Sequence, residues 1–311
     1  MKLLNSKGDS FKMNIGIIGA GSIGLLFGAY LSKMNHTVTL YTRSVEQSSI
    51  LNKEGVLVEY AASSSSSPVR SICIKNGLLT HDVIIIAVKQ YHLPTILDEL
   101  NSIEVTTPLL FIQNGMGHVD LLKDLPHQQI LVGVVEHGAL KKNDFTVIHS
   151  GIGVTKISVF RGDYTILHSL LWSDATPQFP FQLCEDWYEM LLSKLVVNSM
   201  INPLTALFGV ENGQLLSNPY FFKLFQQLFG EINSLLQPGD PEIWWNSVIS
   251  ICERTAENRS SMLRDLEQKR PTEIEGIIGF LRSLPAYSHK NQPVINFLYT
   301  GIKGLEGQRR R

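Results

Sequence analysis

The sequence has little charge imbalance and no long apolar run, and both absences exclude classes of function. Among its 311 residues, 27 Lys and Arg face 28 Asp and Glu, for a formal net charge of −1. This balance gives no electrostatic footprint for nucleic acid or for an anionic membrane. No apolar stretch approaches the roughly 20 residues that span a bilayer. We therefore expect a soluble protein with neither a nucleic-acid nor a membrane partner.

Cysteine is also scarce. Cys73, Cys184 and Cys252 lie far apart, and without a CxxC pair they indicate neither a zinc site nor a redox dithiol. The polar first residues lack the apolar core of a signal peptide, and we expect residues 1–12 to be an extension. An odd cysteine count without a secretory segment favours a cytoplasmic location.

Apolar runs alternate with helical patterns in the first half of the chain. We expect buried strands at 14–19, 37–41, 83–88 and 109–113, and a helix over 22–34. Strands that alternate with helices predict an α/β fold with a doubly wound parallel sheet, here a Rossmann domain over residues 13–180.

The second half differs in character. From Asp186 onward the strand-like runs disappear and helical patterns take over, as at 187–200 and 220–236. The segment Pro177–Pro180 is the best candidate boundary, so we expect a helical substrate-binding domain over 181–311. Five consecutive serines within 61–68 predict a flexible loop or a hairpin tip.

A glycine-rich turn follows the first expected strand. It has the GxGxxG form and consists of Gly19, Ala20, Gly21, Ser22, Ile23 and Gly24. The first glycine makes the tight turn, the second lets a pyrophosphate approach the backbone, and the third lets the helix pack close to the strand. Free N–H groups at the start of the helix would then bind the phosphates. The turn predicts a dinucleotide site.

The end of the second strand selects the dinucleotide. NAD enzymes usually place a carboxylate there, on the ribose hydroxyls, whereas this chain has Tyr41, Thr42, Arg43 and Ser44. The guanidinium of Arg43 can hold the 2′-phosphate of NADP in a bidentate manner. The alternative is an arginine in a solvated loop. The pattern favours NADP(H) as the cofactor.

Polar residues also follow the third and fourth strands. Lys89 ends the third strand, and Asn114 begins the Asn-Gly-Met-Gly segment after the fourth. Open α/β sheets bind ligands at these carboxyl ends. Lys89 is alternatively a surface charge and Asn114-Gly115 a simple turn.

A polar stripe marks the helix expected after residue 187. Lys194, Asn198 and Asn202 recur every four residues and therefore share one helix face. A solvated face is the alternative, but such faces usually carry Glu and Lys rather than two asparagines, which are poor helix formers. Pro203 should end or kink this helix.

A second polar group lies downstream, between Asn258 and Glu275. Thr272 and Glu275 fit a capping box at the start of a helix. Glu273, in the same first turn, is available for function, or it complements the helix dipole.

Together these segments resemble the ketopantoate reductase family. The matching pieces are the glycine motif, Val88-Lys89, Asn114-Gly115-Met116-Gly117, Lys194 through Ala206, Asn212-Gly213, Ser260 through Leu263, and Thr272 through Gly276. They run in order from residue 15 to about residue 281. The KxxxNxxxNPLTA run and the SSM and TEI segments are the most specific.

The resemblance implies reduction of 2-dehydropantoate to (R)-pantoate by NADPH, a step toward pantothenate and coenzyme A. It also implies a C-terminal domain related to that of 6-phosphogluconate dehydrogenase. By motif, Lys194 becomes the catalytic lysine and Glu273 the carboxylate that holds the substrate. The implied substrate contacts are Asn198, Asn202, Asn258 and Ser261. Lys89 and Asn114 become cleft residues near the nicotinamide.

The chemistry fits this assignment. Hydride transfer to a ketone builds negative charge on its oxygen, which a nearby ammonium can stabilise and protonate without a metal. Two alternatives stay open: a paralogue that reduces another branched 2-oxo acid, and a non-catalytic NADPH sensor. The oligomeric state is open too, with a homodimer among the options.

Overall fold

The computed structural model describes residues 12–164, 176–237 and 240–309, and these form two compact units. The first unit comprises the chain up to Gln113 together with 122–187, and the second comprises 114–121 and the chain from Tyr188 onward. The predicted extension over 1–12 lies outside the described residues except for Lys12, which is exposed. The core begins at Met13, which is buried.

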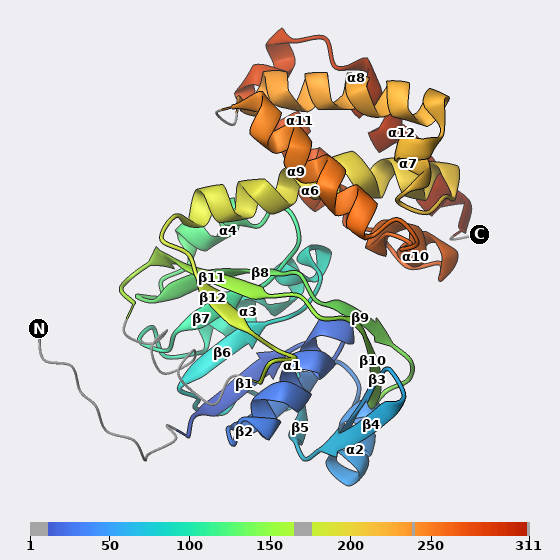
Figure 1. Cartoon of the computed structure of the whole chain (residues 1–311). Helices are drawn as coiled ribbons and strands as arrows, with labels where there is room; N and C mark the ends of the chain where they lie inside the picture. The colour runs from blue at the N-terminus through green and yellow to red at the C-terminus, as the bar shows by residue number, and fades with distance from the viewer. Residues whose placement is uncertain (1–11, 165–175, 238–239, 310–311) are drawn as a thin grey trace, which may run out of the picture. The chain divides into compact units, whose positions relative to one another are not determined.

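The first unit is built on an eight-stranded sheet in the order β12-β11-β8-β7-β6-β1-β2-β5 (Figure 1). All neighbouring strands are parallel except β8 and β11. The four predicted strands are β1 (Asn14–Ile18), β2 (Thr37–Thr42), β6 (Val83–Ile86) and β7 (Leu109–Phe111). They are apolar throughout because both faces of such a sheet are covered. The remaining strands are β5 (Arg70–Cys73), β8 (Ile130–Val135), β11 (Thr155–Arg161) and β12 (Phe181–Leu183).

A second sheet, which the sequence did not reveal, has four strands in the order β4-β3-β10-β9. Its strands are β3 (Val56–Tyr60), β4 (Ser63–Ser67), β9 (Gly138–Lys141) and β10 (Thr146–Gly151). The helix α1 (Ser22–Lys33) contacts all four of these strands as well as β1 and β2. Residues 24–31 of this helix are all buried because a sheet packs on each side of it.

The five serines form the edge strand β4 of a hairpin with β3, so the expected flexible loop was wrong, whereas the alternative of a hairpin was right except that the serines form its second strand and not its tip. Each serine pairs in register with a residue of β3, from Ser63 opposite Tyr60 to Ser67 opposite Val56. Backbone pairing needs no apolar side chain, and four of the five serines are exposed. A turn through Ala61, with a φ of 51°, joins the two strands.

The helices of the first unit are short. They are α2 (Val45–Glu54), η1 (Ile74–Asn76), η2 (Gln90–Ile96) and α3 (Leu97–Asn101), and α4 (Val119–Asp124) begins in the segment assigned to the second unit. At the other end of the first unit, β12 pairs with β11, so the unit extends to Trp187. The predicted boundary at 180 lies just before β12, and it stays a prediction.

The part of the second unit from Tyr188 onward, yellow to red in Figure 1, is helical. Its elements are α6 (Trp187–Phe208), α7 (Gln214–Ser217), α8 (Pro219–Leu236), α9 (Pro241–Arg254), α10 (Ser261–Glu267), η3 (Glu275–Gly279), α11 (Phe280–Ser283), η4 (Pro285–His289) and α12 (Pro293–Arg309). The change to helical structure after Asp186 is thus confirmed.

Helix α6 corrects two expectations. With 22 residues it is long and apolar enough to cross a membrane, but 78% of its most apolar window is buried inside the protein, as in a core helix. It also continues past Pro203 to Phe208, so the expectation that the proline ends the helix was wrong. The turn after the proline is buried, and the Thr205 hydroxyl lies within hydrogen-bond distance of the carbonyls of Ile201 and Asn202. Packing therefore holds a turn that the proline alone would weaken.

Candidate active site

The glycine turn joins β1 to α1 in the first unit. Gly19 has a φ of 110°, and a Cβ on Gly24 would lie 1.7 Å from the Gly19 carbonyl oxygen. The tight turn and the close approach of helix and strand are therefore confirmed. A Cβ on Gly21 would meet no atom within 4 Å, so the described residues leave open space beside this glycine. Gly21 is the N-cap of α1 and has no side chain to occupy the first N–H groups.

Two polar contacts hold this turn. The Gln47 amide donates to the carbonyls of Ala20 (3.0 Å) and Asp144 (2.9 Å). The Ser22 hydroxyl accepts the N–H of Lys141 on β9 at 3.1 Å. Ile23 packs against the core. Among the motif residues, Gly21 and the backbone of the first turn remain the groups best suited to a pyrophosphate.

Arg43 lies where β2 ends and its side chain is exposed. Its neighbour Ser44 caps α2 by accepting the N–H of Gln47 at 3.1 Å. Burial lowers the pKa of His92 in η2, and the nearby positive charge of Arg43 lowers it further. The strand end thus offers a cation, as the sequence predicts, and its 2′-phosphate role stays a prediction.

The end of β6 is fixed by Gln113, a residue at the end of the fourth predicted strand to which no role was assigned from the sequence. The side-chain amide of Gln113, which is buried, donates to the carbonyls of Ile86 (2.7 Å) and Val88 (3.0 Å). These bonds fix the backbone that leads into Lys89, which is partly buried at the start of η2. A glutamine directly after a buried strand was the available signal.

In the second unit, the stripe on α6 is not a solvated face. Asn198 and Asn202 are 6% and 7% exposed, and Lys194 is partly buried. Two buried amides on a helix are costly unless they have polar partners or a ligand. Their contact with substrate stays a prediction.

Glu273 and Asn114, 159 residues apart in sequence, are brought together. The Asn114 amide donates to the Glu273 carboxylate at 2.9 Å, and Glu273 is only 5% exposed. The two segments dock closely, since the Met116 N–H donates to the Gly276 carbonyl at 3.1 Å. A Cβ on Gly115, whose φ is 78°, would lie 2.0 Å from the same carbonyl oxygen, so only glycine fits.

The predicted capping box at Thr272 was wrong. The Thr272 N–H donates to Glu306 of α12 at 2.7 Å, and Glu275 instead accepts from the Tyr299 hydroxyl and pairs with Lys303. A capping box needs the Glu275 carboxylate to reach back to this N–H, and here a residue from a distant helix takes its place.

The remaining predicted contacts differ in exposure. Ser261 and Asn258 are exposed, whereas Ser260 is buried, caps α10 and hydrogen bonds with the Thr205 hydroxyl at 2.7 Å. The carbonyl of Asn258 accepts the N–H of Asn212 at 3.0 Å. Ser260 and Asn212 thus have structural roles that the sequence alone did not separate from binding.

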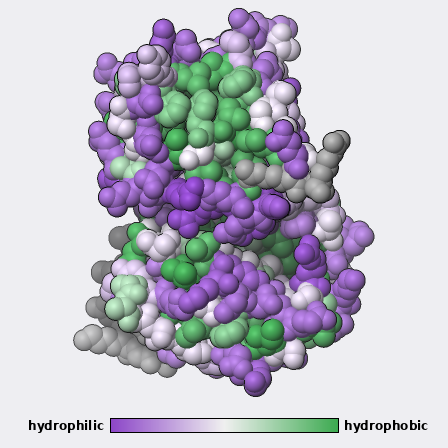
Figure 2. All heavy atoms as spheres, turned by 90° about the vertical axis from the view of Figure 1, so that its right-hand side faces the viewer, coloured by the Kyte–Doolittle hydropathy of each residue, from purple (hydrophilic) through white to green (hydrophobic). Residues whose placement is uncertain are grey.

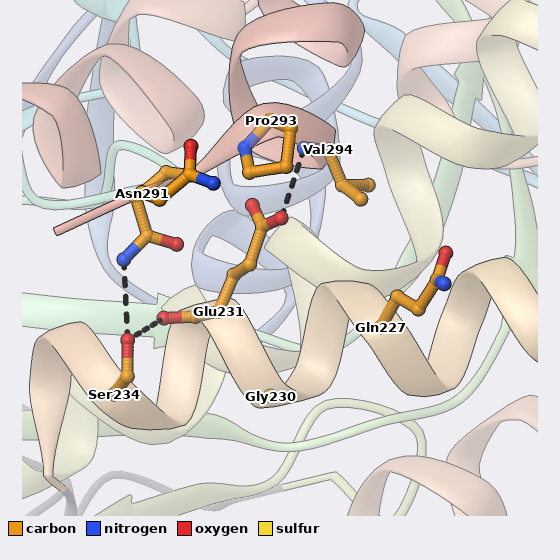
Figure 3. A pocket seen from close by; sticks show the side chains of 8 residues that line it. Gln227, Gly230, Glu231, Ser234, Asn291, Pro293 and Val294 are labelled. Carbon is orange, nitrogen blue, oxygen red and sulfur yellow. Dashed lines mark hydrogen bonds between the residues drawn. The ribbon is translucent and has the colours of Figure 1, made fainter.

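A groove of about 420 Å³ lies between α8 and the start of α12 (Figure 3), and no predicted site residue lines it. The described residues contain no cluster of three or more His, Cys, Asp or Glu that could hold a metal ion.

Comparison with known proteins agrees with the motif assignment. Residues 15–162 match the family described as Ketopantoate reductase PanE/ApbA, and residues 186–306 match its C-terminal part. The chain is 39% identical to the 2-dehydropantoate 2-reductase of Bacillus subtilis, over 94% of this chain and 98% of that protein. The crystal structure of a probable 2-dehydropantoate 2-reductase from B. subtilis has a TM-score of 0.85 at 38% identity, over 94% and 99% of the two chains. D-mandelate dehydrogenase has the same fold, with a TM-score of 0.86 at 21% identity over 96% and 100%.

Proposed function

The chain belongs to the ketopantoate reductase family, and from this premise we propose that it reduces 2-dehydropantoate to (R)-pantoate with NADPH. The observation that carries the proposal is the buried Glu273 carboxylate, with Asn114 bonded to one of its oxygens at 2.9 Å. A buried carboxylate is costly unless its lone pairs are satisfied. The hydroxyl of a 2-oxo-4-hydroxy acid supplies such a donor, which an acid without a hydroxyl lacks.

The first unit supplies the groups for the cofactor. The open space beside Gly21 and the N–H groups at the start of α1 fit a pyrophosphate. The exposed guanidinium of Arg43, with no carboxylate beside it from Tyr41 to Ser44, fits a 2′-phosphate. The nicotinamide of bound NADPH supplies the hydride.

The second unit supplies the groups for the substrate. Lys194 stabilises the negative charge that develops on the ketone oxygen and donates the proton to it. Glu273 orients the substrate through its hydroxyl, and Asn198 and Asn202 hydrogen bond to the polar groups of the acid. Ser261 and Asn258, both exposed, complete the set of expected contacts.

Cytoplasmic location and a homodimer are part of the proposal. The three described cysteines are unbridged, which agrees with a reducing compartment. Apolar side chains gather on one face of the helical unit (Figure 2), and the exposed Tyr220, Ile243 and Phe297 belong to this unit. Light scattering at several protein concentrations tests the assembly.

One assay tests the activity. The oxidation of NADPH is followed with 2-dehydropantoate and, in parallel, with the matched acid that lacks the 4-hydroxyl. We expect kcat/KM to favour the hydroxylated acid strongly, because the acid without the hydroxyl cannot donate a hydrogen bond to Glu273. Equal rates with both acids would contradict the role of Glu273, and no turnover with either would contradict the proposed activity.

A further inference from the structure

Glu273 is held in place by a carboxylate from the last helix of the chain. One oxygen of Glu306, on α12, accepts both the N–H and the hydroxyl of Thr272, at 2.7 and 2.8 Å. Both residues are buried, with Thr272 4% and Glu306 8% exposed. Two donors converging on one oxygen are satisfied best by an ionised carboxylate, whose charge-assisted hydrogen bonds are the strong ones.

The Thr272–Glu306 contact holds the backbone on both sides of Glu273. The Thr272 hydroxyl that donates to Glu306 also accepts the N–H of Ile274 at 3.2 Å. The backbone before and after Glu273 is therefore tied to a single carboxylate oxygen. The carbonyl of Glu273 in turn accepts the Ile277 N–H at 3.2 Å, which leads into the helical segment.

Helix α12, which carries Glu306, is itself anchored at its first turn. Glu231 of α8 accepts the N–H groups of Val294 and Ile295, each at 2.9 Å, and Figure 3 shows its side chain pointing from α8 to Val294. Near the other end of α12, Lys303 lies 3.4 Å from Glu306 and 3.1 Å from Glu275. Burial alone would lower the pKa of Lys303, but its contacts with these two carboxylates raise it.

From this chain of contacts we infer that Glu306 is a positioning residue for the reaction, acting through Thr272 to fix the Glu273 carboxylate. The inference rests on the proposed function. Among the described residues, Glu306 hydrogen bonds with Thr272 and pairs with Lys303, so its effect on the reaction passes through the segment that carries Glu273. A shift of about 1 Å in a positioning group can cost on the order of 10²-fold in rate.

The test compares Glu306→Gln with a matched pair at the other end of the contact, Thr272→Val and Thr272→Ser. The glutamine keeps an acceptor but loses the charge, the valine keeps the shape but loses the hydroxyl, and the serine keeps the hydroxyl. For Glu306→Gln and Thr272→Val we expect kcat/KM for 2-dehydropantoate to fall about tenfold, mainly through KM. Thr272→Ser should stay within about threefold of wild type, since it restores the bond to the ionised carboxylate.

Three further readouts separate positioning from a loss of folding. The stoichiometry of NADPH binding and its Kd should stay unchanged in all variants, and the Thr272→Val plus Glu306→Gln double variant should be about as impaired as either single variant. Unchanged kinetic constants in Thr272→Val would overturn the inference, as would a lowered kcat at constant KM with fewer NADPH sites. If Glu306→Gln does not fold, the kinetic constants of the two Thr272 variants still test whether this contact positions Glu273. A wild-type enzyme inactive on 2-dehydropantoate would instead overturn the proposed function and this inference with it.

Discussion

The buried side chain of His118 predicts that the folded protein loses stability in acid, by an amount that follows from its pKa. The side chain lies in the segment that begins with Asn114, it has no exposed surface, and neither ring nitrogen has a hydrogen-bond partner among the described residues. Burial lowers its pKa from 6.5 to about 4. The native state therefore keeps this imidazole neutral, whereas the unfolded chain takes up a proton once the pH falls below 6.5.

The direction and size of the effect of pH on the free energy of unfolding follow from this difference in pKa. The stability contributed by the neutral ring is fully present above pH 6.5 and is lost as the pH falls from 6.5 to about 4, where the native state is protonated too. Each pKa unit corresponds to about 1.4 kcal/mol, so the full loss is about 3 kcal/mol. That is a large part of the roughly 5–15 kcal/mol that stabilises a typical domain.

The perturbation is His118→Leu, which introduces an apolar side chain of similar size and removes both unpaired nitrogens. We expect it to be more stable than wild type by about 1 kcal/mol or more at pH 7.5, because a buried polar group without a partner costs about 1–3 kcal/mol. At pH 4.5 the advantage should grow by a further amount of about 2.5 kcal/mol. Urea unfolding followed by circular dichroism measures the difference in unfolding free energy between variant and wild type at each pH.

A matched control separates the effect of proton uptake by the ring from the cost of burying a polar side chain. His118→Asn keeps a polar side chain that cannot take up a proton at these pH values, so it should lose the acid sensitivity without the gain at pH 7.5. If His118→Leu loses as much stability between pH 7.5 and 4.5 as wild type does, the buried ring is not the source of the acid sensitivity and the reasoning fails.

Three predictions concern the proposed reaction. Lys194→Ala should lower kcat by about 10²–10³-fold, since oxyanion charge exists only in the transition state. Lys194→Arg should not restore kcat fully, because a guanidinium is too weak an acid to donate the proton. A kcat/KM of Lys194→Ala within threefold of wild type would refute the catalytic role of Lys194. Glu273→Ala should damage turnover and substrate affinity while the fluorescence-measured Kd of NADPH stays nearly normal, whereas a purely structural residue would show a lowered Tm with near-normal kinetics. Arg43→Ala should remove most of the preference for NADPH over NADH, measured as the ratio of kcat/KM values, and a wild type that uses both equally would contradict the assignment.

The sequence by itself determined the elements whose pattern is local. The strands at Asn14–Ile18 and Thr37–Thr42, the glycine turn between them and the helical second half all follow from side-chain period and from the steric needs of glycine. The stripe of Lys194, Asn198 and Asn202 is equally a property of the helix period, and the motifs of these segments identify the family.

Other elements depended on partners far away in the chain. The serine strand at Ser63–Ser67 exists because β3 pairs with it, and the helix continues past Pro203 because its last turn is buried. Local propensity opposes both structures, since runs of serine favour loops and proline interrupts helices. Tertiary packing overrides such weak preferences when it buries enough surface.

The pairings around Glu273 were likewise beyond the sequence. A single chain predicts which residues carry charge, but not that Asn114 lies 2.9 Å from a carboxylate 159 residues away or that Glu306 takes the place expected for Glu275. Side-chain period acts over a few residues, whereas these contacts arise only when separate helices and loops pack. The sequence determined which polar and charged side chains are available to the predicted site, and the tertiary structure decided which of them bond to one another.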